Sequence, residues 1–70
     1  MSLSIGQTIK RLRKERNLTQ EELAEKSGVS RGTISALESG TIRITTTKTL
    51  VKLAQALETT VDHIFFADDV

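Results

Sequence analysis

The feature that most restricts the fold of this chain is a very short connection between two segments that both carry helix signals. Gly28 follows the first segment, and a single residue, Val29, separates it from Ser30, which precedes the second. Glycine is suited to the left-handed position after a helix, and serine accepts hydrogen bonds from the free N–H groups of a first turn. A connection this short does not let two helices lie flat and antiparallel. The sequence therefore predicts two short helices that cross steeply.

The helix before this connection has the strongest start signals in the chain. Thr19 and Glu22 have the spacing of a capping box, in which each side chain accepts a hydrogen bond from the other residue's backbone N–H. Leu18 and Leu23 have the spacing of a hydrophobic staple across the same helix start. The helix after the connection is expected over residues 31–39, where a second glycine follows it. Two short helices joined in this way have the outline of a helix-turn-helix.

Three further helices are predicted around this motif. Ser4 and Gln7 form a second capping-box pattern, which opens a helix that runs to about Arg16. A fourth helix is expected from about Thr47, and Thr60 caps a last short one. The residues expected to point inward are Ile5, Ile9, Leu12, Leu23, Ala24, Val29, Ile34, Leu37, Ile44, Leu50, Leu53, Ala54, Leu57, Val61, Ile64 and Phe65. We therefore expect one all-α domain of five helices over residues 1–70.

Composition restricts the class of function. The 70 residues are 37% hydrophobic and 27% charged, with no proline and no cysteine, which is typical of a compact helical domain and excludes disulfides and thiolate metal sites. No apolar run approaches the ~18 residues of a membrane span, and no signal-peptide pattern is present, so we expect a soluble, cytoplasmic protein. His63 is the only histidine, no phosphate-binding loop or metal-ligand cluster is visible, and we expect neither an enzyme nor a metal or cofactor.

Charge is unevenly distributed along the chain. The formal net charge is only +1, but residues 1–20 carry five Lys and Arg against one Glu. Residues 61–70 carry three Asp and no Lys or Arg. A basic start of this kind suits one face to phosphates, although an ordinary solvated helix surface explains it equally well. Lys10, Arg11 and Lys14 are expected at the solvated surface, with diffuse attraction to phosphates as the alternative.

The segment from Leu18 to Gly40 closely resembles the helix-turn-helix of the Cro and phage-repressor (Xre-type) family. It contains the patterns TQ-x-x-LA, SGVS and TIS-x-LE-x-G in order, and TL-x-x-LA-x-AL follows over residues 49–57. The resemblance covers about residues 5–66. It implies a five-helix, lambda-repressor-like domain that binds a specific double-stranded DNA sequence as a transcriptional regulator, more often a repressor than an activator. One departure is visible, since many members carry a proline in the loop where this chain has three threonines at residues 45–47.

The resemblance places the helix over residues 31–39 in the DNA major groove. Its outer side carries small residues instead of the Lys and Glu of an ordinary solvent-facing helix, which suits close contact with another surface; a plain exposed helix is the alternative. Only Arg31 on this helix can make a bidentate contact to guanine. Because Gly32 stands where the family often has a longer side chain, we expect DNA shape to contribute to specificity. The candidate base-contacting residues are Arg31, Gly32, Thr33, Ser35 and Ala36.

Candidate contacts to the DNA backbone surround this helix. They are Arg13, Thr19, Gln20, Ser39, Thr41 and Arg43. The helix that begins at Gln20 offers free N–H groups to a phosphate, and the resemblance implies a phosphate contact there; an ordinary first-turn residue is the alternative for Gln20. The resemblance also pairs Arg13 with Glu38 in a structural salt bridge that orients the recognition helix. A free arginine that binds phosphate is the alternative for Arg13.

The C-terminal helix is the predicted interface between two copies of the chain. Phe66 has no expected inward position, and an exposed phenylalanine in a protein with only two aromatic residues favours an interface. With Val61 and Ile64 it forms the candidate dimer surface; the alternative is that Phe66 folds back over the fourth helix. A two-fold dimer would bind a near-palindromic operator. The alternative function is a protein-interaction module, such as an antitoxin or a partner-binding regulator. Neither a membrane nor a small-molecule ligand is expected.

Overall fold

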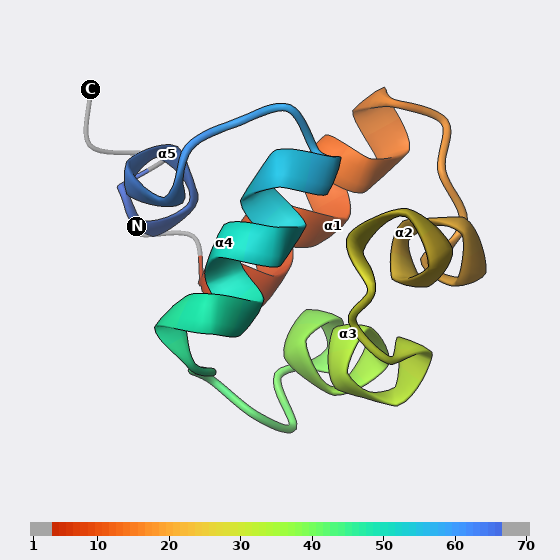
Figure 1. Ribbon diagram of the computed structural model, residues 1–70. Helices are drawn as coiled ribbons and strands as arrows, with labels where there is room; N and C mark the ends of the chain where they lie inside the picture. The colour runs from red at the N-terminus through yellow and green to blue at the C-terminus, as the bar shows by residue number, and fades with distance from the viewer. Residues whose placement is uncertain (1–3, 67–70) are drawn as a thin grey trace.

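The computed structural model describes residues 4–66, and this part of the chain is all-α. In Figure 1, α4 crosses the centre in front of α1, while α2 and α3 lie together on the right and α5 lies on the left. The elements are α1 (Ile5–Glu15), α2 (Gln20–Ser27), α3 (Arg31–Ser39), α4 (Thr47–Ala56) and α5 (Val61–Phe65). The predicted five-helix fold is thereby confirmed. The expected acidic end at Asp68 and Asp69 lies outside the described residues. Over residues 4–66, no helix has the length and apolar character that crossing a membrane requires.

A hydroxyl side chain caps the start of every helix. Each one accepts a hydrogen bond from the backbone N–H three residues further on, which satisfies a donor that has no partner within the helix. The five capping residues are Ser4, Thr19, Ser30, Thr46 and Thr60. Both predicted capping boxes form, with Gln7 and Glu22 as the returning side chains. Gly28 (φ 77°) and Gly40 (φ 83°) end α2 and α3 in the left-handed conformation that favours glycine.

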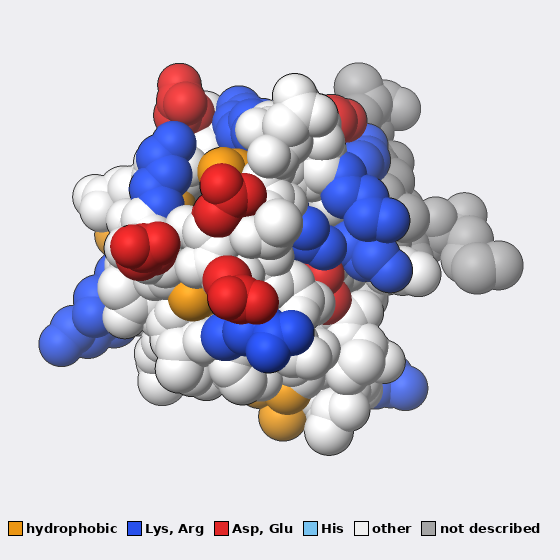
Figure 2. All heavy atoms as spheres, turned by 90° about the vertical axis from the view of Figure 1, so that its right-hand side faces the viewer, with side chains coloured by type: hydrophobic (Ala, Val, Ile, Leu, Met, Phe, Trp, Pro, Cys, Tyr) orange, Lys and Arg blue, Asp and Glu red, His pale blue; other side chains and the backbone are white. Residues whose placement is uncertain are grey.

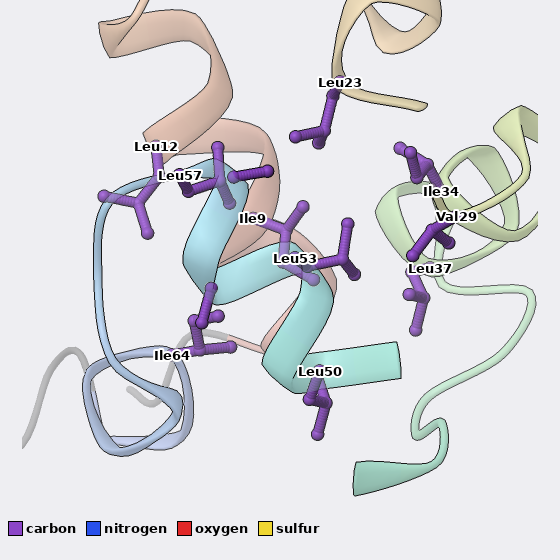
Figure 3. Packing of buried hydrophobic residues seen from close by; sticks show 12 residues of the cluster. Ile9, Leu12, Leu23, Val29, Ile34, Leu37, Leu50, Leu53, Leu57 and Ile64 are labelled. Atoms are coloured by element: carbon purple, nitrogen blue, oxygen red, sulfur yellow. The ribbon is translucent and has the colours of Figure 1, made fainter. Parts of the chain in front are cut away.

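One cluster of apolar side chains fills the space between the helices (Figure 3). Ile9 and Leu53 lie at its centre between α1 and α4, and Leu23 and Ile34 reach them from α2 and α3. None of these four side chains is exposed. The inner sides of α2 and α3 therefore belong to the same core as α1 and α4, which fixes the helix-turn-helix on the rest of the molecule.

Three predictions about apolar residues were wrong. Phe65 was expected in the core and is 40% exposed, because Ile64 and Val61 are the residues of the short helix α5 that pack against the core. Ile64 was expected on the dimer surface but is 1% exposed, so it cannot contact a partner in this conformation. Ile44 was expected beneath its loop and is 67% exposed. Leu37 and Leu50 already fill the core at that end of the molecule (Figure 3).

Candidate nucleic-acid interface

The outer side of α3 is the surface that the sequence assigns to DNA. Ile34 and Leu37 turn inward and are buried. The predicted base-contacting residues lie on the other side: Arg31, Gly32 and Ser35 are exposed, and Thr33 and Ala36 are partly exposed. α3 therefore presents small side chains with one long cationic side chain at its N-terminal end, a shape that the major groove of B-DNA admits.

Two of these five residues have local features that bear on their role. The hydroxyl of Thr33 accepts a hydrogen bond of 2.8 Å from Ser30 Oγ and is therefore partly engaged in the cap of α3. A Cβ placed on Gly32 would meet nothing within 4 Å, so the fold does not require a glycine there. The open space in front of Gly32 leaves room for another molecule to approach the backbone of α3.

An ion pair between Arg13 and Glu38 joins α1 to α3. Nε of Arg13 donates to Oε2 of Glu38 at 2.8 Å, and Nη2 donates to Oε1 at 3.0 Å. Arg13 Nη1 also donates to the carbonyl oxygen of Leu18 at 2.6 Å, and Gln20 Nε2 donates to Glu38 Oε1 at 3.1 Å. The pair is nearly buried, since the side chains of Arg13 and Glu38 are 11% and 4% exposed. The pairing that the resemblance implies is thus present, and the amide of Gln20 takes part in it.

The surroundings of this pair shift the pKa of both groups. Burial by itself would raise the pKa of Glu38, but the hydrogen bonds from Arg13 and Gln20 and the charges of Arg13 and Lys10 outweigh it, so the pKa lies below its usual value. The hydrogen bond to Glu38 raises the pKa of Arg13 in spite of burial. Both groups therefore stay charged at neutral pH, and α3 is held to α1 by an ionised, bidentate contact.

A hollow of about 310 Å³ lies over this ion pair. Its lining comes from α1, α2 and α3 and consists of Lys10, Arg13, Lys14, Gln20, Ser35, Glu38 and Ser39. Figure 2 shows the face formed by α2 and α3, with several Lys and Arg side chains together on its right-hand side. Lys10 and Lys14 were expected at the solvated surface and are exposed, and they also share this hollow with Gln20. Their spacing of four residues, which places both on one side of a helix, was the signal for it.

The remaining candidates for contacts to the DNA backbone lie at two places. Thr19 caps α2, where its Oγ1 accepts from the N–H of Glu22 at 3.0 Å. At the end of α3, Ser39 Oγ lies 2.9 Å from Thr41 Oγ1. Arg43 is exposed and lines a second hollow, of about 570 Å³, between the end of α3 and the first turn of α1. Ser39 lines both hollows, so it connects the two places, whereas Arg43 does not line the hollow over the ion pair.

Gly6 is a residue of this region that the sequence reasoning missed. It is buried in the first turn of α1, against the backbone of α3. A Cβ at this position would lie 1.7 Å from the carbonyl oxygen of Leu37. Glycine weakens a helix relative to alanine, so its presence inside an amphipathic helix was a signal that something approaches closely.

Two exposed phenylalanines lie at the C-terminal end of α5. α5 lies on the other side of the molecule from α2 and α3 (Figure 1). Phe66 is 58% exposed, which favours the interface over the alternative that it folds back over the fourth helix. Phe65 lies beside it with a ring-centroid distance of 6.2 Å. Val61 is partly exposed. The exposed apolar surface of this region therefore consists of Phe65 and Phe66, and the partly exposed Val61 also packs against the core. Phe65 takes the place of the predicted Ile64.

Comparison with known proteins gives consistent matches. A family model described as "Helix-turn-helix" matches residues 9–64. An uncharacterized HTH-type transcriptional regulator of Sinorhizobium fredii is 49% identical over 53 residues, which are 76% of this chain and 68% of that protein. The HTH-type transcriptional repressor RghR of Bacillus subtilis is 44% identical over 55 residues, 79% of this chain but 41% of RghR. The crystal structure of the biofilm regulator SinR in complex with DNA has a TM-score of 0.84 at 35% identity, covering 86% of this chain and 95% of that one.

Proposed function

This chain belongs to the helix-turn-helix family of DNA-binding transcriptional regulators, and on that premise we propose that α3 reads a specific operator from the major groove and that the chain acts as a repressor. The observation that carries the proposal is a combination of two features: the outer side of α3 carries mostly small side chains, and a basic hollow lies beside it. The first can lie close against base edges, and the second offers charge to the phosphates that flank them. A DNA-binding regulator of this kind acts in the cytoplasm.

Base reading in this proposal depends mainly on Arg31. Its exposed guanidinium at the start of α3 can donate two hydrogen bonds to O6 and N7 of a guanine. Ser35 and Ala36 add a hydroxyl and a methyl group further along the helix, while Thr33 has a hydroxyl partly engaged with Ser30. Gly32 has no side chain and therefore lets the backbone of α3 approach the base edges closely. Direct reading is therefore limited to a few bases, and sequence-dependent DNA shape supplies part of the specificity.

Phosphate contacts in this proposal come from both ends of the interface. At one end, Lys10, Lys14 and Gln20 line the hollow over the ion pair. Gln20 begins α2 after the cap residue Thr19, and N–H groups at a helix start can bind a phosphate. At the other end are Ser39, Thr41 and Arg43. Arg13 has a structural role first, because three of its donor atoms already have partners.

The test is a selection of binding sites from random duplex DNA, followed by titration of the enriched site at several salt concentrations. We expect Arg31→Ala to weaken binding by about 1–3 kcal/mol and to relax preference at one base position of each half-site. Lys10→Ala should weaken all duplexes alike and reduce the salt slope by about one. Arg11→Ala is the matched control, because Arg11 is an exposed arginine of α1 that does not line the hollow. If no sequence is enriched, the helix-turn-helix serves a protein partner instead of DNA.

We also propose that two copies associate through Val61, Phe65 and Phe66, so that the operator is nearly palindromic. The support is the exposure of two adjacent phenylalanines on one short helix. Sedimentation should show a dimer for the wild type and a monomer for Phe66→Asp. Ile44→Asp serves as control, because Ile44 is an exposed apolar residue in a different part of the molecule. A wild type that stays monomeric at high micromolar concentration contradicts the proposal.

A further inference from the structure

We infer that Gly6 is a positioning residue for DNA reading, because the absence of its side chain sets how closely α3 sits on α1. This inference rests on the proposed function, since it concerns how accurately α3 enters the groove. Gly6 has no side chain that could bind DNA, and the nearest atoms that a Cβ on it would meet are backbone atoms of Leu37 and Glu38, so it acts through the placement of α3.

The contact at Gly6 is one of backbone against backbone. A Cβ on Gly6 would lie 1.7 Å from the oxygen and 2.5 Å from the carbon of the Leu37 carbonyl, and 3.1 Å from the N–H nitrogen of Glu38. A neighbouring side chain could rotate away from an added methyl group, but the carbonyl of Leu37 belongs to the backbone of α3 and cannot rotate by itself. It also accepts the hydrogen bond of 3.2 Å from Gly40 N–H that ends the helix. The only relief for a larger residue is therefore a separation of the two helices.

The other partner in the contact is equally fixed. Gly6 stands inside the first turn of α1, where the Ser4 and Gln7 side chains close a capping box with hydrogen bonds of 2.9 and 3.1 Å. This box prevents the turn from fraying away from α3 without the loss of both hydrogen bonds. α1 would then have to move as a whole, by more than about 1 Å, to reach an ordinary carbon–oxygen contact distance of about 3.3 Å.

Gly6 and Arg13 together attach α3 to α1 at two points. They are seven residues apart, which is about two turns, so they lie on the same side of α1. Gly6 contacts the backbone of Leu37, and Arg13 binds the carboxylate of the next residue, Glu38. Two contacts about 10 Å apart along α1 hold α3 at a defined distance and also at a defined tilt. A larger residue at Gly6 pushes the backbone of Leu37 away from α1, while the ion pair and the buried side chain of Ile34 still hold α3, so α3 changes its tilt.

Tilt matters for this interface because its contacts come from different helices. Arg31 and Ser35 belong to α3, whereas Lys10 and Lys14 belong to α1. Hydrogen bonds to bases weaken steeply when donor and acceptor move by several tenths of an ångström or lose alignment, whereas attraction between lysines and phosphates is nearly insensitive to such shifts. A misplaced α3 therefore loses discrimination between sequences and keeps its affinity for random DNA.

The test compares Gly6→Ala with a variant of similar stability whose lesion lies elsewhere. Leu57→Ala is suitable, because the buried Leu57 packs near Leu12 at the end of the core away from α3 (Figure 3). Each folded protein is titrated with the selected operator and with a scrambled duplex of equal length. We expect Gly6→Ala to lose about tenfold or more in the ratio of the two affinities, with the scrambled duplex and its salt slope unchanged. Leu57→Ala should keep the wild-type ratio.

The inference is overturned if Gly6→Ala retains the wild-type ratio, or if Leu57→Ala loses it equally. If Gly6→Ala is unfolded in buffer, all three proteins are measured in trimethylamine N-oxide, which favours the folded state. A readout without DNA separates this inference from the proposed function: Gly6→Ala should shift the NMR signals of Arg13 Nε–H and of the α3 amides, and Leu57→Ala should not. A wild type that does not discriminate between duplexes contradicts the proposed function, whereas unshifted α3 signals in Gly6→Ala contradict the inference alone.

Discussion

Glu38→Ala should destabilise this protein much more than the loss of an exposed carboxylate. Glu38 accepts hydrogen bonds from Nε and Nη2 of Arg13 and from Nε2 of Gln20, and its side chain is 4% exposed. In the variant, Arg13 would keep its hydrogen bond to the carbonyl of Leu18 but would lose its counter-ion. Because the Arg13 side chain is only 11% exposed, water could replace the lost carboxylate only in part.

We expect a loss of about 2–4 kcal/mol in the free energy of unfolding. Removal of one partner from a fully buried ion pair costs about 3–5 kcal/mol, because a buried charge is left without compensation. Partial access of water to Arg13 and the small cavity left by the truncation act in opposite directions and broaden this range. For a domain of this size, each kcal/mol lowers Tm by about 4–8 °C, so Tm should fall by at least about 8 °C.

Urea denaturation at neutral pH, followed by far-UV circular dichroism, measures this loss. Glu15→Ala is the matched control, because Glu15 also pairs with an arginine, Arg11, but at 3.9 Å and with a side chain that is 56% exposed. Surface pairs of this kind contribute at most about 0.5 kcal/mol. A change within 0.5 kcal/mol for Glu38→Ala, on the same order as the control, would refute the reasoning. The double variant Arg13→Met with Glu38→Leu should recover part of the loss, because it leaves no buried charge.

Two further predictions concern the core and the response to acid. Thr8 is fully buried, and its Oγ1 has no hydrogen-bond partner among the described residues. Thr8→Val should therefore raise the free energy of unfolding by about 1 kcal/mol. If urea denaturation instead shows a lower free energy of unfolding, the hydroxyl has a partner. The pKa of Glu38 is lowered in the folded state, so its contribution to stability is complete above the ordinary glutamate pKa of about 4.3 and disappears as the pH falls through the lowered value. The difference in unfolding free energy between wild type and Glu38→Gln should therefore shrink below about pH 4, and a difference independent of pH in urea titrations would contradict the assignment.

The boundaries of the helices could be predicted from the sequence because their signals are local. Each cap joins residues three positions apart, so the sequence contains both partners of the hydrogen bond. The pairs Ser4 with Gln7 and Thr19 with Glu22 were recognised from spacing alone, and both form. Gly28 stops α2 for an equally local reason, since its φ of 77° is costly for other residues.

Features that depend on the packing of distant segments were predicted less well. Ile64 and Phe65 are neighbours in a helix of five residues, which is too short to show a period, so the sequence did not indicate which of them faces the core. The exposure of Ile44 depends on how much space Leu37 and Leu50 leave. The glycine at position 6 signals a close approach, but its partner is a backbone carbonyl 31 residues further along, which the sequence does not indicate.

The sparse outer side of α3 makes the placement of that helix more important in this chain than in one with longer reading residues. A long side chain such as Arg31 can reach a base from several backbone positions, because its rotatable bonds compensate for small displacements. Ser35 and Ala36 have no such reach, so their contacts exist only when the backbone of α3 is at the correct depth. The accuracy that the side chains cannot supply must come from the support beneath the helix. That support consists of the buried side chains of Ile34 and Leu37, the ion pair of Arg13 with Glu38 and the backbone contact at Gly6.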